Sequence, residues 1–77
     1  MTLKELRLDK GLSQSQLAEA AEISIRTLQQ YEQGARDING CRLKTLIKLS
    51  NALECDIIEI LTDDELIEMI KNKDTFL

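Results

Sequence analysis

Between Ser13 and Gly34 the sequence shows two short helix patterns that are separated by only two residues. This feature constrains the possible fold most. Ser13 is a helix N-cap residue, and Gln16 three positions later can reach back to complete a capping box. Ser24 is a second N-cap candidate, and it follows the first helix almost at once. Gly34 suits the left-handed conformation that ends many helices. Two helices joined this closely must cross at a steep angle, so the pattern predicts a helix-turn-helix.

Apolar residues at helical spacing give each of these two helices an inner side. Leu17, Ala18 and Ala21 share one side of the first helix, while Leu28 and Tyr31 face inward from the second. The outer side of the second helix then carries a mostly polar row made of Ile25, Arg26, Gln29, Gln30 and Gln33.

In a helix-turn-helix the second helix enters the major groove of DNA. Arginine can donate two hydrogen bonds to guanine, glutamine can pair bidentately with adenine, and an aliphatic side chain can contact a thymine methyl group. A polar row on an isolated helix would merely be solvated. Opposite a core-facing stripe in this motif, we predict that it reads base edges.

The rest of the chain also has helical patterning. Proline is absent and only Tyr31 and Phe76 are aromatic, so we expect an all-α fold with a core of leucine, isoleucine and alanine. Ile38 is expected to anchor the loop after Gly34. Thr2 with Glu5, Asp56 with Glu59, and Thr62 with Glu65 form further capping-box patterns. The predicted helices cover residues 3–10, a stripe from Asn39 or Gly40 to Leu53, a short segment after Asp56, and Asp63 to about Asn72.

Charge is distributed unevenly along the 77 residues, although the net charge is −4. Residues 1–53 carry a net charge of +2, whereas residues 54–77 carry −6. The local field near phosphate matters more than the total, so an acidic chain can still bind DNA. Helix N-termini and basic side chains near the predicted motif are the candidates for phosphate contact. They are Gln14, Ser24, Arg36, Arg42 and Lys44.

Other functional classes find little support in the residues. Cys41 and Cys55 lie fourteen positions apart in a chain without histidine, so we expect reduced thiols and no metal site. No nucleophile–base arrangement or phosphate loop is recognisable, so we expect neither an enzyme nor a cofactor. The absence of a signal peptide or an apolar run of membrane length predicts a cytoplasmic protein without membrane contact.

The C-terminal part invites two interpretations. We place a DNA-binding domain at 1–61 and a helical extension at 62–77. Apolar residues of the extension either pack on their own domain or form a subunit interface. We predict a homodimer with an interface that includes Ile57, Leu61, Leu66, Met69 and Ile70. An alternative function is an antitoxin or interaction module that binds a toxin or other protein through the acidic residues 54–77.

The segments LKELRLDKGLSQSQLAEAAEISIRTLQQYEQG and LKTLIKLSNALECDIIEIL resemble the Cro/repressor-type, or XRE, helix-turn-helix family. The resemblance covers about residues 3–61. It implies a five-helix bundle of the lambda-repressor type, to which this chain adds a further C-terminal helix. It also implies a transcriptional regulator, most often a repressor, that binds double-stranded DNA as a dimer on a two-fold symmetric operator.

The same resemblance assigns roles to individual residues. It implies that Arg7 pairs with Glu32 and ties the first helix to the end of the third. It implies that Gln14 supports the recognition helix, and that the polar row beginning at Ile25 is the base-reading face. Glu22 and Glu54 stand where the family usually has glycine, so both are expected to adopt positive φ at some cost.

Overall fold

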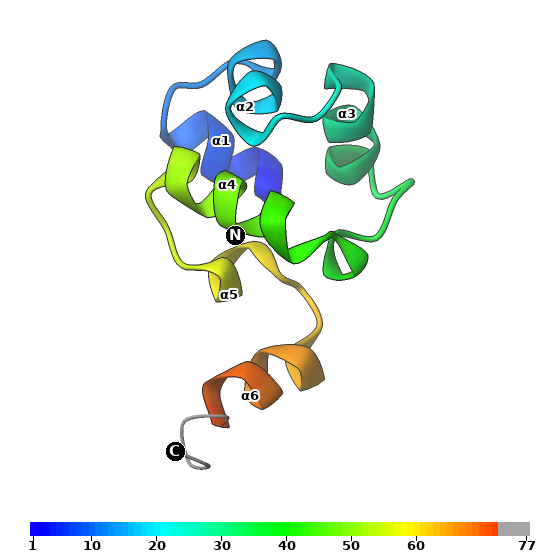
Figure 1. Ribbon diagram of the computed structural model, residues 1–77, viewed down its shortest axis with the longest axis vertical. Helices are drawn as coiled ribbons and strands as arrows, with labels where there is room; N and C mark the ends of the chain where they lie inside the picture. Colours follow the sequence, from blue (N-terminus) through cyan, green and yellow to red (C-terminus); the bar gives the residue numbers. More distant parts are fainter. Residues whose placement is uncertain (73–77) are drawn as a thin grey trace.

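A computed structural model describes residues 1–72, and within that range the chain forms six α-helices, one 3-10 turn and no strand (Figure 1). The prediction of an all-α fold with an extra C-terminal helix is confirmed. The last part of the predicted extension, 73–77, lies outside the described residues. The elements are α1 (Leu3–Asp9), α2 (Gln14–Ala21), α3 (Ile25–Gln33), η1 (Ile38–Gly40), α4 (Leu43–Leu53), α5 (Ile57–Ile60) and α6 (Asp64–Asn72).

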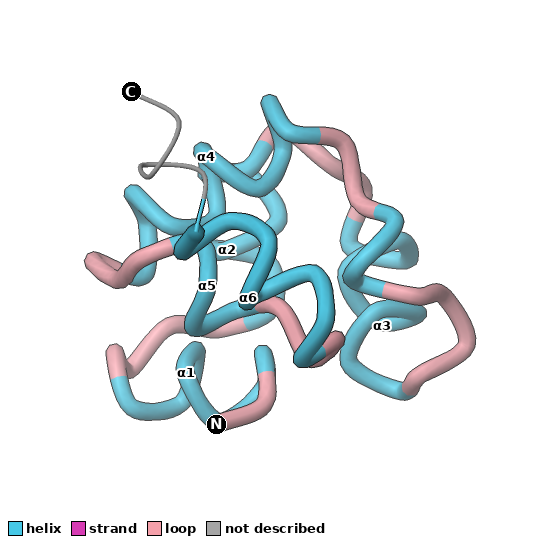
Figure 2. The backbone as a smooth tube through the Cα atoms, turned by 90° about the horizontal axis from the view of Figure 1, so that it is seen from below, coloured by secondary structure: helices cyan, strands magenta, loops and turns pink. Residues whose placement is uncertain are grey.

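The core lies where the first five helices meet. Its five largest fully buried side chains come from α2, α3, α4 and α5. α2 packs against both α3 and α4, and α5 packs against α4. Seen from below, α6 lies beside α5 and away from α3 (Figure 2). The fully buried residues are Leu17, Leu28, Leu49, Leu53 and Ile60.

Local hydrogen bonds explain where the helices begin. The Ser13 hydroxyl accepts from the Gln16 N–H at 3.0 Å, and the Gln16 side chain accepts from the Ser13 N–H at 2.8 Å. Thr2 and Glu5 form the same reciprocal box at α1. Asp56 and Glu59 form another at α5. Each box pairs backbone donors that the first helical turn would leave unsatisfied.

One expected helix start and one expected helix cap are wrong. The helix predicted from Asn39 or Gly40 begins at Leu43, because Asp37 caps a short 3-10 turn first and accepts from the Asn39 N–H at 2.9 Å. Thr62 does not form a capping box with Glu65. Asn39 is the reason: its side chain accepts from the Thr62 N–H at 2.8 Å and donates to the Thr62 hydroxyl at 2.9 Å.

The start of α6 is capped by the next residue instead. The Asp63 carboxylate accepts from the Glu65 N–H at 3.0 Å and from the Leu66 N–H at 3.3 Å. The Asp63 N–H in turn donates to the Asn39 side chain at 2.9 Å. Asn39 therefore ties η1 to the linker that precedes α6.

Both glutamates that stand in place of glycine adopt the left-handed conformation. Glu22 ends α2 with φ 57° and Glu54 ends α4 with φ 53°, as the family resemblance implies. No helix in residues 1–72 is long and apolar enough to cross a bilayer. The same residues contain no group of three or more side chains that could hold a metal ion, and both cysteines are free thiols.

Candidate nucleic-acid interface

The outward side of α3 carries the side chains that the sequence predicts for base reading. Ser24 starts this helix by accepting from the Thr27 N–H at 3.0 Å, and Gly34 ends it at φ 78°. Leu28 is fully buried, and the half-buried Tyr31 packs against the same core. The inner side of α3 is thereby fixed, and its opposite side faces solvent.

The five residues of this face differ in how far they are exposed. Ile25, Arg26 and Gln33 are exposed, whereas Gln29 and Gln30 are half-buried. The apolar Ile25 is 42% exposed at the first turn of the helix. A polar helix face with an exposed aliphatic residue and an exposed arginine has the chemistry to contact both base edges and methyl groups.

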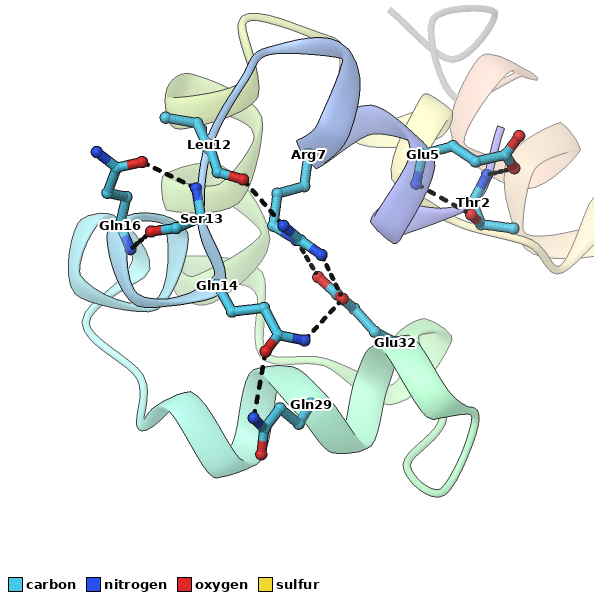
Figure 3. Close-up of polar contacts among 9 residues, drawn as sticks. All are labelled: Thr2, Glu5, Arg7, Leu12, Ser13, Gln14, Gln16, Gln29 and Glu32. Carbon is cyan, nitrogen blue, oxygen red and sulfur yellow. Dashed lines mark hydrogen bonds and ion pairs between the residues drawn. The ribbon is translucent and has the colours of Figure 1, made fainter.

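Gln29 and Gln30 are half-buried because neighbouring side chains hold them. Gln29 Nε2 donates to Gln14 Oε1 at 3.2 Å, which links the recognition helix to the start of α2 (Figure 3). Gln30 Oε1 accepts from Arg36 Nε at 3.3 Å. The Arg36 guanidinium also lies 5.9 Å from the centre of the Tyr31 ring. The loop after α3 is therefore folded back onto the helix.

Arg7 and Glu32 form a buried ion pair that ties α1 to the end of α3. Arg7 Nε donates to the Glu32 carboxylate at 2.7 Å and Nη2 donates to it at 3.1 Å. Arg7 Nη1 donates to the Leu12 carbonyl at 2.9 Å. Burial raises the pKa of the Glu32 carboxyl, but hydrogen bonds from Arg7 and Gln14 outweigh burial, and the pKa lies below its ordinary value.

The residues predicted to contact phosphate differ in whether their side chains are already hydrogen-bonded within the protein. The Gln14 side chain is engaged within the protein, so the backbone at the start of α2 is the part left to meet an anion. The Ser24 hydroxyl is engaged in its cap. Arg42, the N-cap of α4, and Lys44, in its first turn, are both exposed, and α4 begins shortly after η1.

Two ion pairs at the left-handed turns were not predicted from the sequence. The Glu22 carboxylate pairs with Lys48 of α4, and Glu54 pairs with Lys10 at 2.7 Å. Hydrogen bonds from these lysines lower the pKa of both carboxyls. Because the partners lie far apart in the chain, no short spacing signals them. The Lys48 pair offsets the negative charge that Glu22 brings to the helix-turn-helix.

The residues predicted for a subunit interface do not all share one surface. Leu61 is only 5% exposed in the core of its own chain, so its assignment to an interface is wrong. Ile57, Leu66 and Ile70 are half-buried against that core, and Met69 is 63% exposed. A shallow groove between α4, α5 and α6 is lined by Ile47, Ser50, Asn51, Cys55, Asp56, Ile57, Ile58 and Ile70.

Comparison with known protein families and solved structures shows which family this chain belongs to. A helix-turn-helix family model matches residues 3–60. One similar solved chain belongs to a complex of the SinR protein with the SinI protein. It is 25% identical, with a TM-score of 0.67 over 95% of this chain and 75% of that chain. No curated protein sequence matches. Because the family model spans most of the sequence, the chain belongs to the Cro/repressor-type (XRE) helix-turn-helix family.

Proposed function

We propose that this protein is a sequence-specific transcriptional regulator, most simply a repressor, that binds double-stranded DNA in the cytoplasm. Membership of the helix-turn-helix family supports DNA binding, and domains of this family are typically not enzymes. The observation that carries the proposal is the exposed outer face of α3, opposite the buried Leu28. A single α-helix of this kind fits the major groove.

The side chains on this face suit different base edges. Arg26 is exposed and can give two hydrogen bonds to guanine, while the amides of Gln29, Gln30 and Gln33 can pair with adenine. Ile25 can pack against a thymine methyl group. Phosphate contacts would come from the backbone at Gln14 and Ser24, and from Arg36, Arg42 and Lys44.

A homodimer would let two recognition helices read one side of the duplex. Half-sites one helical turn apart require the two helices to lie about 34 Å apart. We place the interface on the C-terminal extension, 62–77, together with α5. The exposed Met69 supports this placement, as do the half-buried Ile57, Leu66 and Ile70 beside it.

The test is selection of binding sites from a random duplex library, followed by affinity measurements on the selected site. Arg26→Ala should weaken binding by about 1–3 kcal/mol and relax the preference at one base pair. Lys4→Ala on α1 is the matched control, because it also removes one exposed positive charge and lies outside α3 and the proposed dimer interface. If Arg26→Ala binds the selected site as the unaltered protein does, the proposed reading face is wrong.

The acidic C-terminal part supports a second candidate, an antitoxin or other module that binds a partner protein. Residues 54–72 contain seven acidic residues and one lysine beside the groove of α4, α5 and α6. The similar solved chain comes from a complex of two proteins, SinR and SinI. A basic partner that co-purifies and displaces the homodimer would favour this function. A homodimer that occupies the groove and resists displacement would exclude it.

A further inference from the structure

Two hydrogen bonds among three side chains link the buried ion pair to the outer face of α3. Gln14 Nε2 donates to Glu32 Oε1 at 3.1 Å, and Gln29 Nε2 donates to Gln14 Oε1 at 3.2 Å (Figure 3). The Glu32 side chain is 3% exposed and is also held by Arg7. Glu32, Gln14 and Gln29 therefore form a continuous chain from the protein interior to the predicted reading surface.

The chemistry of Glu32 fixes the donor-to-acceptor direction of these two hydrogen bonds. An ionised carboxylate can only accept hydrogen bonds, whereas a glutamine amide has an accepting end and a donating end. Gln14 must therefore turn its NH2 group toward Glu32, which leaves its carbonyl oxygen for Gln29. Gln29 must then turn its own NH2 group toward Gln14. Flipping either amide would bring two oxygen atoms together.

This direction limits what Gln29 can offer to a base. One N–H of its amide is given to Gln14, so one N–H and the carbonyl oxygen remain. Adenine presents one acceptor and one donor in the major groove, which this remaining pair can satisfy. Guanine presents two acceptors there, and a carbonyl oxygen facing either of them would be repelled.

We propose that Glu32, acting through Gln14, is a positioning residue that sets Gln29 to prefer adenine over guanine. The inference rests on the proposed function, in which α3 lies in the major groove. Glu32 itself contacts no base in this arrangement. Its effect is on selectivity at a single base pair, beyond its effect on stability.

The first test compares adenine with guanine at the base pair that Gln29 reads. This position is the one whose preference is lost in Gln29→Ala. The unaltered protein should prefer adenine by about tenfold or more, as expected for a bidentate pair. In Glu32→Gln the new amide can both donate and accept, so Gln14 can flip and the preference should fall to about twofold or less. Glu19→Gln, which removes an exposed carboxylate from α2, should retain the adenine preference of the unaltered protein.

A second variant covers the case in which Glu32→Gln does not fold. Gln14→Met removes the middle amide while leaving Arg7 and Glu32 paired. It should weaken the adenine preference to the same extent. In the free protein, NMR should show slow hydrogen exchange at one Gln29 side-chain N–H, and Gln14→Met should abolish that protection.

The outcomes separate the inference from the proposed function. If the unaltered protein selects a DNA site but neither variant alters the adenine preference, the inference is overturned and the function stands. If the unaltered protein selects no sequence at all, the proposed function fails and the inference fails with it. Loss of the adenine preference in both variants, with Glu19→Gln unchanged, supports both.

Discussion

Among residues 1–72, Arg7 and Glu32 have the most deeply buried charged side chains, 8% and 3% exposed. Removing charge from water is costly, and the pair compensates through two direct hydrogen bonds and further contacts to Leu12 and Gln14. The same carboxylate that fastens α1 to α3 also holds Gln14 against the recognition helix. Glu32 therefore affects both the stability of the fold and the shape of the reading face.

Arg7→Ala should strongly destabilise the protein because it leaves Glu32 buried without its cation. The free energy of unfolding should fall by about 3–5 kcal/mol, a large share of what a domain this small has available. Lys10→Ala is the matched control, since its ion pair with Glu54 is exposed and should contribute little. Urea denaturation measures both. Similar unfolding free energies for the two variants would contradict this account.

The pH dependence of stability should reveal Glu32 separately. Its folded-state pKa lies below the ordinary value of 4.5, so its ionised form stabilises the fold above that pH. The contribution is lost as the pH falls below 4.5 and through the lower folded-state pKa. Denaturation from pH 7 to pH 3 should therefore show a steeper loss for the unaltered protein than for Glu32→Gln. Parallel curves would show that Glu32 is not stabilised in its ionised form.

At the scale of helices and turns, the sequence predicts the fold well wherever the signal is local. The Ser13–Gln16 box needs only residues three apart, and the left-handed Glu22 and Glu54 follow from the family's glycine positions. The start of α4 was missed because Asp37 caps a short 3-10 turn before it, and the cap of α6 was missed because Asn39 bonds across 23 residues to Thr62.

The same distinction applies to the candidate interface. The alternation of Leu28 with the polar row predicts which side of α3 is exposed, because it depends on helical periodicity alone. The half-burial of Gln29 and Gln30 could not be predicted in this way. It depends on Gln14 and Arg36, which only the tertiary fold brings to them.

Substitutions at two left-handed positions should change the melting temperature in opposite directions. Glu54→Gly should raise the melting temperature by a few degrees, because glycine adopts φ 53° without strain and the exposed ion pair it removes contributes little. Gly34→Ala, at φ 78° with no neighbouring atom within 4 Å of the new methyl group, should lower it through backbone strain alone. Calorimetry that gave the same sign for both would contradict the assignment.

At the scale of the whole molecule, the two ends have different chemistry. The chain measures 39 × 24 × 20 Å, with α3 at one side and α6 at the far end (Figure 1). Residues 1–53 carry a net charge of +2, whereas residues 54–72, which include α5 and α6, contain seven acidic residues and one lysine. This arrangement places the most acidic part of the described chain away from α3.

Met69→Glu should disrupt the proposed homodimer, because it places a charge on an exposed apolar residue of α6. We expect the dissociation constant of the dimer to rise about tenfold or more if Met69 lies at the centre of the interface. Leu8→Glu is the control, since Leu8 is similarly exposed on α1. Sedimentation velocity measures both. A monomeric unaltered protein that still binds its DNA site would refute the dimer.

The proposed function requires that the outer face of α3 contacts base edges in the major groove. An NMR titration of the protein with its selected DNA site tests this most directly. We expect the largest chemical-shift changes at Ile25, Arg26, Gln29 and Gln33, with further changes at the start of α2. DNA binding that leaves these residues unshifted, and shifts α5 and α6 instead, would contradict it.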